Sequence, residues 1–320
     1  METSNLPTEF FAALASADLA AVSRLLAAAP RLAHAHGELA EHGRRSTALQ
    51  AAVEVHNIDI VKELLRYGAD VNDTAVAGGW SPLHLALKQP EMVRLLLEHG
   101  AEIDAHALAG LGDEVALRRW LEDAPDAVAQ RGPDGATPLH FAATEAVAGL
   151  LLDRGAAIDT RDEDHGMTPL EWLAHDRLVS AFLLRRGAAV EHVFTAASVG
   201  DVVRMLSFLR ADPAAVRKRT GSENYYGAGV SLLHLAARHG HAATMVLLLE
   251  RGAEVDAQGS WFQVTPLHWA AQYGHADAVR LLLAYGGDPE TADDHGRSPA
   301  DWARYGGYAE LESELRSRVR

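Results

Sequence analysis

One short motif recurs along the chain and limits what it can fold into. The fullest copy, from Thr265 to Ala271, reads Thr-Pro-Leu-His-Trp-Ala-Ala, and a Gly-His pair and a Leu-rich segment ending in glycine follow it. Similar copies begin at Ser81, Thr137 and Ser231, and looser ones begin at Thr47, Thr168 and Ser298. A motif that returns this often with the same neighbours predicts a repeated structural unit rather than one globular core.

Each residue of the unit has a physical role in a pair of helices. A Thr or Ser hydroxyl caps the first helix, and proline suits its first position because that amide has no partner there. The Ala-Ala pair lets neighbouring helices approach closely, Gly-His supplies the turn, and the closing glycine ends the second helix in a left-handed conformation. One unit cannot bury its apolar face alone, so neighbouring units are expected to stack and share a core.

The motif identifies a family resemblance. Thr-Pro-Leu-His-x-Ala is the signature of the ankyrin unit of about 33 residues, and the chain resembles the ankyrin-repeat family over nearly its whole length, as a stand-alone array of bacterial type. The resemblance implies an all-α ankyrin-repeat solenoid of about ten helix-turn-helix repeats with finger hairpins. Residues 1–320 would then form a single domain, since no linker divides the chain.

Three segments without the motif resemble one another. Asp18, Asp113 and Asp201 are each followed, twelve residues later, by a proline. Two motif units lie between successive segments, which predicts a three-repeat module present three times. The expected modules span about 8–103, 104–190 and 191–288, and a C-terminal capping repeat spans 289–320.

Some middle units are shorter than the others. The fourth motif position and the closing glycine are 18 residues apart for His268 and Gly286, but 15 apart for His140 and Gly155. This difference predicts trimmed helices or turns in the middle of the chain.

Composition limits the cellular setting and the partner. The chain has no cysteine, no apolar run near the roughly 18 residues of a membrane span, and no basic or apolar start typical of an export signal. We therefore expect a cytoplasmic protein without membrane contact. A net charge of −15 disfavours nucleic acid and favours a protein partner with a neutral or basic surface.

Most of the 17 histidines and the large aromatic residues are predicted to be structural. The motif histidines should bond the backbone of the helix-entry turn, and repeats about 10 Å apart cannot gather them around one metal ion. The aromatic residues after the fourth motif position should pack in the core against the second helix: Phe141, Trp172, Trp269 and Trp302. Trp120 and Phe208 share an aligned position in a Leu-rich helix and are also expected in the core.

No catalytic residue, metal ligand or cofactor is predicted, because the chain has no His-Glu-x-x-His, phosphate-binding glycine loop or Gly-x-Ser-x-Gly motif. The resemblance implies instead that partners bind through finger tips and the two residues after Ala-Ala. On the first helices these positions are Arg238, His239, Gln272, Tyr273 and Tyr305. The adjoining fingers contribute Tyr225, Tyr226, Trp261 and Phe262, and Tyr, Trp and Arg dominate binding hot spots.

The predicted function is a non-catalytic scaffold or adaptor that binds a protein on the concave face and the finger loops. One alternative is a small-molecule-binding protein or an unrecognised enzyme, with a pocket between the long fingers and the concave helices of the last module. In that case His239, Tyr225 or Tyr226 would be the acid–base candidates. Another alternative is a structural or oligomerising array that buries Trp80 or Trp261 between copies. The sequence leaves the partner and the oligomeric state open.

Overall fold

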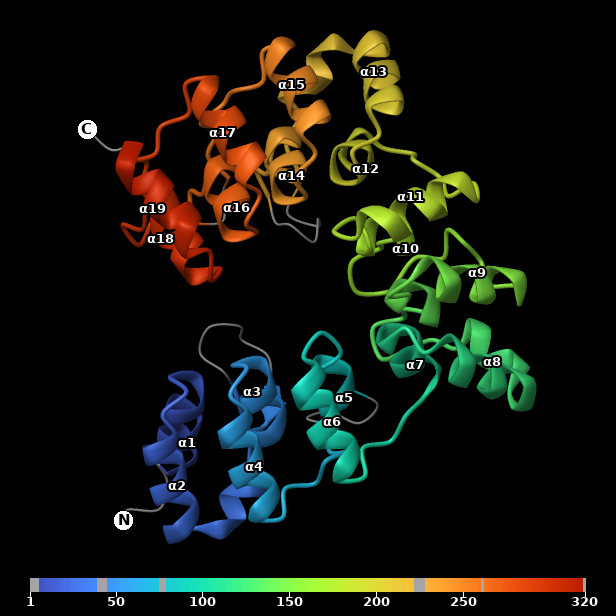
Figure 1. Cartoon of the computed structure of the whole chain (residues 1–320), viewed down its shortest axis with the longest axis vertical. Helices are drawn as coiled ribbons and strands as arrows, with labels where there is room; N and C mark the ends of the chain where they lie inside the picture. The colour runs from blue at the N-terminus through green and yellow to red at the C-terminus, as the bar shows by residue number, and fades with distance from the viewer. Residues whose placement is uncertain (1–5, 39–44, 75–78, 222–227, 260–261, 319–320) are drawn as a thin grey trace. The chain divides into compact units, whose positions relative to one another are not determined.

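The computed structural model describes residues 6–38, 45–74, 79–221, 228–259 and 262–318. The chain divides into two compact units, Met1–Asp164 and His165–Arg320. Both are built from short helices, as Figure 1 shows. The predicted single domain and its module boundaries remain predictions.

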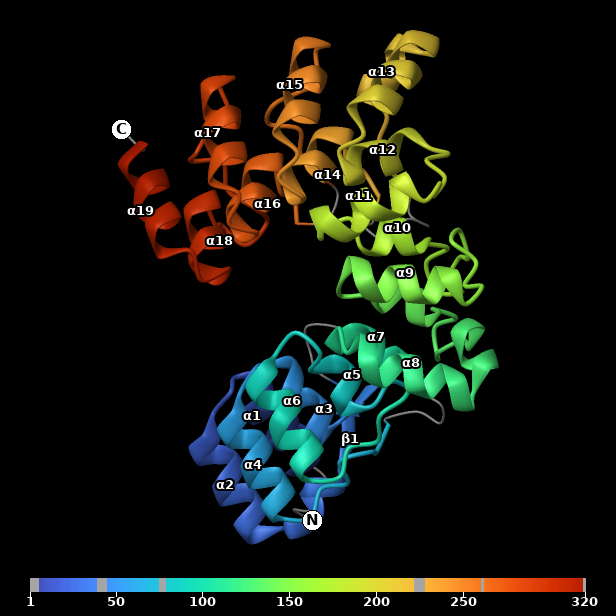
Figure 2. The same ribbon diagram turned by 45° about the vertical axis from the view of Figure 1, so that its right-hand side comes forward.

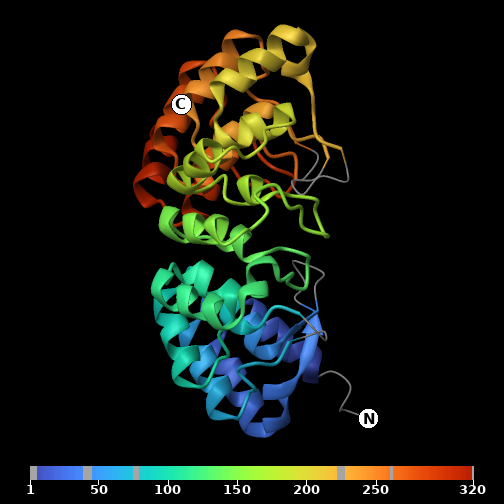
Figure 3. The ribbon, with the colours of Figure 1, turned by 90° about the vertical axis from the view of Figure 1, so that its right-hand side faces the viewer.

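Unit 1 contains five consecutive helix pairs among its described residues. The pairs are α1 (Leu6–Ala15) with α2 (Leu19–Ala28), α3 (Ala48–Glu54) with α4 (Ile58–Arg66), α5 (Pro82–Leu85) with α6 (Pro90–Glu98), α7 (Ala105–Leu111) with α8 (Glu114–Asp123), and the 3-10 helix η3 (Pro138–Phe141) with α9 (Glu145–Asp153). Two further 3-10 helices, η1 (Pro30–His34) and η2 (Pro125–Ala129), follow α2 and α8. Strands β1 (His36–Glu38) and β2 (Arg45–Thr47) pair antiparallel on one side of these helices (Figure 3).

Unit 2 repeats the arrangement with five more pairs in its described part. They are α10 (Pro169–Trp172) with α11 (Arg177–Arg185), α12 (Val193–Val199) with α13 (Val202–Ala211), α14 (Leu232–Arg238) with α15 (Ala242–Glu250), α16 (Pro266–Gln272) with α17 (Ala276–Ala284), and α18 (Pro299–Tyr305) with α19 (Ala309–Arg318). The 3-10 helix η4 (Pro213–Arg217) follows α13. Within the unit, first helices contact first helices and second helices contact second helices, as the run from α14 to α19 shows in Figure 2.

The stacked layers confirm the predicted unit. Gly240 and Gly274 of the Gly-His turns lie in the left-handed region, with φ angles of 69° and 72°. The closing glycines Gly252 and Gly286 also lie in the left-handed region, at 85° and 89°. The helix faces between the layers are apolar and buried, so the core runs through each unit as a continuous seam.

The shortening of the middle units falls entirely on their first helices. α5, η3 and α10 are four residues long, whereas α14, α16 and α18 are seven. The second helices α6, α9 and α11 keep nine residues, as α15 and α17 do. The second helices carry the fully buried Leu96, Leu151 and Leu183 of the core. Their length therefore stays at nine residues in the shortened units.

The three segments without the motif share one structure. Asp18, Asp113 and Asp201 cap α2, α8 and α13, and each carboxylate accepts a hydrogen bond from the amide three residues on. Each of these helices has ten residues, and the proline that follows begins a five-residue 3-10 helix. The recurrent Asp–Pro spacing therefore encodes a longer second helix with a 3-10 extension.

In repeats that carry the motif, the polar side chain at the fourth position forms hydrogen bonds both to the start of its own helix and to the next repeat. His234 accepts from the amide of Ser231 through Nδ1 at 3.3 Å and donates through Nε2 to the carbonyl of Val264 at 2.9 Å. Gln50 makes the same two bonds, accepting from the Thr47 amide and donating to the Trp80 carbonyl at 2.7 Å. Such bonds satisfy a helix-entry amide and a finger carbonyl together, and they confirm the structural role predicted for the motif histidines.

The histidines of the Gly-His turns form a second set of connections between repeats. His241 donates through Nε2 to the carbonyl of Ser198 at 2.7 Å, and His275 donates to the carbonyl of Arg238 at 2.9 Å. Burial lowers the pKa of His241 to about 4, so the ring is neutral near pH 7 and retains its single donor for this bond.

Several aromatic residues differ from the predicted core positions. Trp269 is buried, but Phe141, Trp172 and Trp302 are only half-buried. Two of these rings lie against the motif histidine of the preceding repeat, with centroids 5.3 Å apart for Trp269 and His234 and 5.7 Å for Trp302 and His268. The rings of Trp269 and Trp302 therefore cover the hydrogen bonds that His234 and His268 make to the next repeat, and they also pack against the core.

The prediction for Trp120 is wrong. Its side chain is 38% exposed, because Leu117 and Leu121 occupy the core-facing side of α8. Phe208, at the aligned position of α13, is half-buried.

The last described helix, α19, packs against α18, and the capping role expected of residues 289–320 remains a prediction. α19 buries Leu311 and Leu315 and leaves its outer side polar. Arg316 in its last turn bonds Glu312 and Asp301, and Arg280 of α17 pairs with Glu314 through both carboxylate oxygens. These ion pairs fix α19 against the two preceding helices.

Candidate functional site

The surface predicted to bind a partner lies at the carboxyl ends of α14, α16 and α18 in unit 2. Arg238, Gln272 and Tyr305 each stand seven residues after their cap, so they occupy equivalent places on three stacked helices. His239 and Tyr273 are the next residues of α14 and α16 and end those helices.

Two of the predicted residues are brought into direct contact. The guanidinium carbon of Arg238 lies 4.4 Å from the centroid of the Tyr273 ring and 5.4 Å from that of Trp269. An arginine over an aromatic face is attracted by the negative charge of the ring face. The arrangement joins two neighbouring repeats through a cation–π contact at the surface.

The remaining helix positions differ in exposure. Tyr305 is 77% exposed and Tyr273 is 36% exposed, whereas His239 is only 8% exposed. Burial, together with the nearby charge of Arg238, lowers the pKa of His239 well below its usual value. The ring of His239 is therefore neutral at pH 7. The accessible part of the surface consists of the half-buried Arg238 and Gln272 with the exposed Tyr273 and Tyr305.

The finger residues are described only in part. Phe262 is 41% exposed, has a φ of 54°, and its ring centroid lies 5.0 Å from that of His295 in the next finger. Its carbonyl accepts a hydrogen bond from the amide of Asp294 at 2.9 Å. Tyr225, Tyr226 and Trp261 lie outside the described residues.

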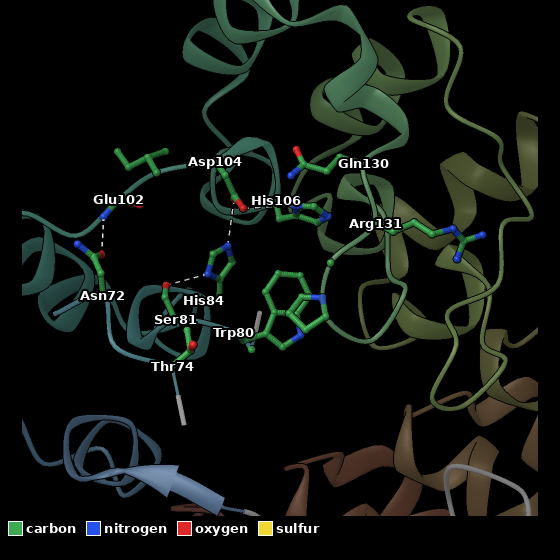
Figure 4. Close-up of a pocket in the computed structure, with 14 residues that line it drawn as sticks. Asn72, Thr74, Trp80, Ser81, His84, Glu102, Asp104, His106, Gln130 and Arg131 are labelled. Atoms are coloured by element: carbon green, nitrogen blue, oxygen red, sulfur yellow. Dashed lines mark hydrogen bonds and ion pairs between the residues drawn. The ribbon is translucent and has the colours of Figure 1, made fainter. Parts of the chain in front are cut away.

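A cavity that sequence reasoning missed lies in unit 1. It has a volume of about 420 Å³ and lies between the fingers that precede α5, α7 and η3. Trp80, His84, Asp104, His106 and Arg131 are among the residues that line it, and Figure 4 shows the side chains of His84, Asp104 and His106 meeting near the indole of Trp80.

Trp80 organises one wall of the cavity. Its indole nitrogen donates to Asp134 at 3.0 Å, and its ring lies 4.7 Å from His84, 5.3 Å from His106 and 5.0 Å from Phe141. A Cβ at Gly132 would come within 2.2 Å of this ring, so only glycine lets the finger pass so close. Trp80 thus packs inside its own chain.

Asp104 lies at the centre of the polar wall. It caps α7, and its Oδ1 accepts from the amide of Ala107 at 2.8 Å and faces Nε2 of His84 at 3.0 Å. Burial would raise the pKa of Asp104, but the contacts with His106, His84 and the Ala107 amide outweigh it and hold that pKa well below its usual value. The carboxylate is therefore charged at every physiological pH.

Two sequence signals could have indicated this site. Asp104 stands where Thr or Ser caps the first helix of the repeats that carry the motif, and Trp80 ends an unusually long finger. Among the described residues, those of the cavity included, no group of three or more His, Asp or Glu side chains is placed to hold a metal ion. None of the described helices is long and apolar enough to cross a membrane.

Comparison with known proteins agrees with the repeated layers. The family model described as Ankyrin repeats (3 copies) matches residues 10–107, 193–293 and 233–312, and the model described as Ankyrin repeat matches residues 134–163. The chain belongs to the ankyrin-repeat family. The predicted all-α ankyrin solenoid is thereby confirmed, whereas its bacterial type remains a prediction. Residues 108–133 and 164–192, which include the shortened α10, fall outside these matched ranges.

Individual ankyrin relatives match only part of the chain. The human 2-5A-dependent ribonuclease is 40% identical over 73 residues, which cover 21% of this chain and 10% of that protein. Human protein phosphatase 1 regulatory subunit 27 is 41% identical over 66 residues, which cover 20% of this chain and 42% of that protein. Potassium channel AKT3 of Oryza sativa subsp. japonica is 35% identical over 95 residues, which cover 29% of this chain and 9% of that protein. The chain therefore spans less than half the length of each of these relatives.

Proposed function

We propose that this ankyrin protein is a non-catalytic scaffold that binds a partner protein through unit 2. The binding surface would comprise the carboxyl ends of α14, α16 and α18 and the fingers that carry Tyr225, Tyr226, Trp261 and Phe262. The observation that carries the proposal is the contact of the Arg238 guanidinium with the ring of Tyr273, 4.4 Å from its centroid.

This contact is suited to binding because it holds the side chains of Arg238 and Tyr273 in place before a partner binds. Arg238 lies near two rings and Tyr273 ends a helix, so both side chains would lose little freedom on binding. Arginine and tyrosine are enriched among the residues that contribute most to protein–protein binding. Tyr305, with 77% of its surface exposed, adds a third anchor on the neighbouring repeat.

The partner would have a neutral or basic surface and would meet the protein in the cytoplasm. The net charge of −15 favours such partners by electrostatic attraction and disfavours phosphate backbones. One relative is by name a regulatory subunit of a phosphatase, which agrees with a binding role by analogy. Small-molecule binding or catalysis in the last module, and self-association, are the alternative functions.

The test is a binding measurement with paired variants. Affinity purification would first identify a partner, and the purified partner would then be titrated into the wild-type protein and into Arg238→Ala/Tyr273→Ala. We expect the double variant to bind at least about tenfold more weakly, because hot-spot residues each contribute about 1–4 kcal/mol.

Tyr285→Ala is the matched control, since Tyr285 is 42% exposed but lies at the end of the second helix α17. It should change the affinity less than about twofold, as surface positions outside a hot spot do. Equal binding by the wild-type protein and the double variant would show that the partner uses another surface.

A further inference from the structure

Unit 2 carries a basic surface although the chain as a whole is acidic. From Arg177, the first residue of α11, to Arg219, just after η4, there are eight Arg or Lys residues and three Asp or Glu residues, whereas the whole chain has a net charge of −15. α13 and η4 pack against each other and contribute Arg204, Arg210 and Arg217, which are all exposed. The charge at this surface is therefore opposite in sign to the net charge of the molecule.

The described part of the chain does not neutralise the three arginines. Asp212 is the one carboxylate between Arg210 and Arg217, and it already pairs with Lys218 at 3.0 Å. Among the described residues, none forms a hydrogen bond or an ion pair with the guanidinium group of Arg204, Arg210 or Arg217. Within these ranges the three groups therefore keep their donors for a carboxylate from outside the chain.

The fold does not require these arginines, because an equivalent element forms without them. α8 and η2 of unit 1 have the same lengths as α13 and η4 and follow the same type of Asp cap. The equivalent positions of α8 and η2 carry no basic residue and are occupied by Ala116, Glu122 and Ala129. Neither the capping nor the packing of this element therefore accounts for the basic surface.

An exposed apolar side chain lies on the same helix as two of the arginines. Val203 of α13 is 77% exposed. Ser207 and Arg210 follow it by four and seven residues, so they share its side of the helix. Met205 and Leu209 are buried on the opposite side. Figure 1 shows α13, α15 and α17 in one row and α12, α14 and α16 in another, so this surface belongs to the second helices, whereas the surface of Arg238 belongs to the first helices.

We propose that the surface formed by Val203, Arg204, Arg210 and Arg217 binds an acidic segment of a partner protein. Asp or Glu side chains of that segment would pair with the arginines, because a guanidinium group can donate two parallel hydrogen bonds to one carboxylate. An apolar side chain of the segment would cover Val203. A nucleic acid is disfavoured, since its phosphate chain offers nothing apolar to Val203 and would continue onto the acidic remainder of the molecule.

The experiment compares probes that differ in charge and in chemical class. The ¹⁵N-labelled full-length protein is titrated by NMR, at pH 7.5 and low salt, with acetyl-Glu-Leu-Glu-Glu-Leu-Glu-amide, with the same peptide carrying Gln in place of every Glu, and with decauridylate RNA. We expect the acidic peptide to shift the amide signals of α13 and η4 and the Gln peptide to bind at least about tenfold more weakly, a loss of about 1.4 kcal/mol. The RNA should bind more weakly than the acidic peptide. Equal binding of the two peptides, RNA binding as tight as that of the acidic peptide, or no binding of the acidic peptide would overturn the proposal.

Arg204→Ala/Arg210→Glu/Arg217→Ala is the decisive variant. It gives α13 and η4 the residues that α8 and η2 already carry at the same positions, so it should fold with an unchanged melting temperature. It should bind the acidic peptide at least about tenfold more weakly, because the three cationic partners are lost. Wild-type affinity in this variant would overturn the proposal.

Arg31→Ala/Arg94→Ala/Arg119→Glu is the matched control, because it replaces three exposed arginines of unit 1 and changes the net charge by the same amount. It should leave the affinity for the acidic peptide within about twofold of the wild-type value. An equal loss in the two triple variants would overturn the proposal, because net charge rather than the surface of α13 and η4 would then govern binding. Val203→Ser keeps every charge and should weaken binding at least about threefold through lost apolar burial; an unchanged affinity would contradict the apolar contact.

Discussion

At the scale of single residues, the side chain at the fourth motif position makes two kinds of hydrogen bond. It accepts one from the amide at the start of its own helix, and it forms a second one to the next repeat. Neutral histidine forms both bonds at His234, and glutamine forms both at Gln50. At Glu171 the carboxylate accepts from the Thr168 amide and from the hydroxyl of Thr195. The chemistry of the position is therefore conserved within the chain although the residue type varies.

Histidine at this position makes the fold sensitive to acid. His234 is 0% exposed, and burial lowers its pKa from 6.5 to about 4. Above pH 6.5 the ring is neutral in both the folded and the unfolded chain, so its full contribution to stability is present. Between pH 6.5 and 4 the unfolded chain binds a proton that the folded chain does not, and the free energy of unfolding falls by about 1.4 kcal/mol per pH unit.

We predict that His234→Gln removes part of this acid sensitivity. Glutamine can make the bonds that Gln50 makes, but it does not titrate. Urea unfolding at pH 7.5 and at pH 5 should therefore show a loss of stability that is about 2 kcal/mol smaller in the variant than in the wild-type protein.

His234→Ala is the contrasting variant. It would leave the Ser231 amide unpaired, remove one of the two hydrogen bonds to the Val264 carbonyl, which keeps its bond from the Gly259 amide, and create a cavity, so it should cost about 2–4 kcal/mol at pH 7.5. Asp301 does not affect the comparison, because its pKa, lowered to about 2 mainly by bonds from Ser298, changes stability only below pH 3.8. An equal loss between pH 7.5 and 5 in the wild-type protein and the glutamine variant would contradict the assignment to His234.

At the scale of helices, successive layers are held by interlocking turns. The glycine of one turn makes room for the histidine of the next, because a Cβ at Gly200 would lie 2.5 Å from Nδ1 of His241. That ring cannot move away without breaking its bond to the Ser198 carbonyl. The glycine is thus required by the neighbouring repeat as well as by its own φ of 71°.

Gly200→Ala is therefore expected to destabilise the protein more than Gly252→Ala. Gly252 has a φ of 85°, but a Cβ there would meet nothing within 4 Å. Its replacement should cost only the left-handed strain of about 1–2 kcal/mol, whereas Gly200→Ala should cost a further 1–3 kcal/mol, roughly, for overpacking. Urea unfolding at pH 7.5 measures both values, and equal losses would show that the His241 ring is not fixed.

The helix pairs were predictable because their signals are local. Caps, Gly-His turns and closing glycines each act within a few residues, so the motif at Thr265 determines α16 without knowledge of the rest. The spacing between His140 and Gly155 also predicted a shortened unit, but not that the first helix alone is short. That outcome depends on the core contacts of the second helix, which a linear spacing does not contain.

The positions that depend on stacking were not predictable in the same way. Trp120 and Phe208 share a sequence position, yet Trp120 is exposed because α8 buries its leucines instead. The cavity combines Trp80, His84 and Asp104 from two successive repeats, one of which lacks the motif. Only the stacked structure brings these side chains together, although the replacement of a hydroxyl cap by Asp104 was visible in the sequence.

At the scale of the whole molecule, the core is divided into layers that depend on their neighbours. In unit 1, α4 packs against α2, α3 and α6, and in unit 2, α15 packs against α13, α14 and α17. In such an array stability is approximately a sum of repeat terms and nearest-neighbour terms. A local defect should therefore spread over adjacent layers and weaken with distance along the chain, whereas in a single globular core it would affect every element.

Leu64→Ala tests this behaviour. Leu64 is fully buried on α4, and its truncation should cost about 2–5 kcal/mol because it leaves a cavity in the core. Amide hydrogen exchange followed by mass spectrometry should show faster exchange in α1 to α6 and unchanged exchange in α14 to α17. Leu248→Ala on α15, which is equally buried, should give the opposite pattern. If both variants accelerated exchange uniformly from α1 to α19, the units would unfold as one cooperative core, because only a shared core transmits the loss of one side chain to every helix.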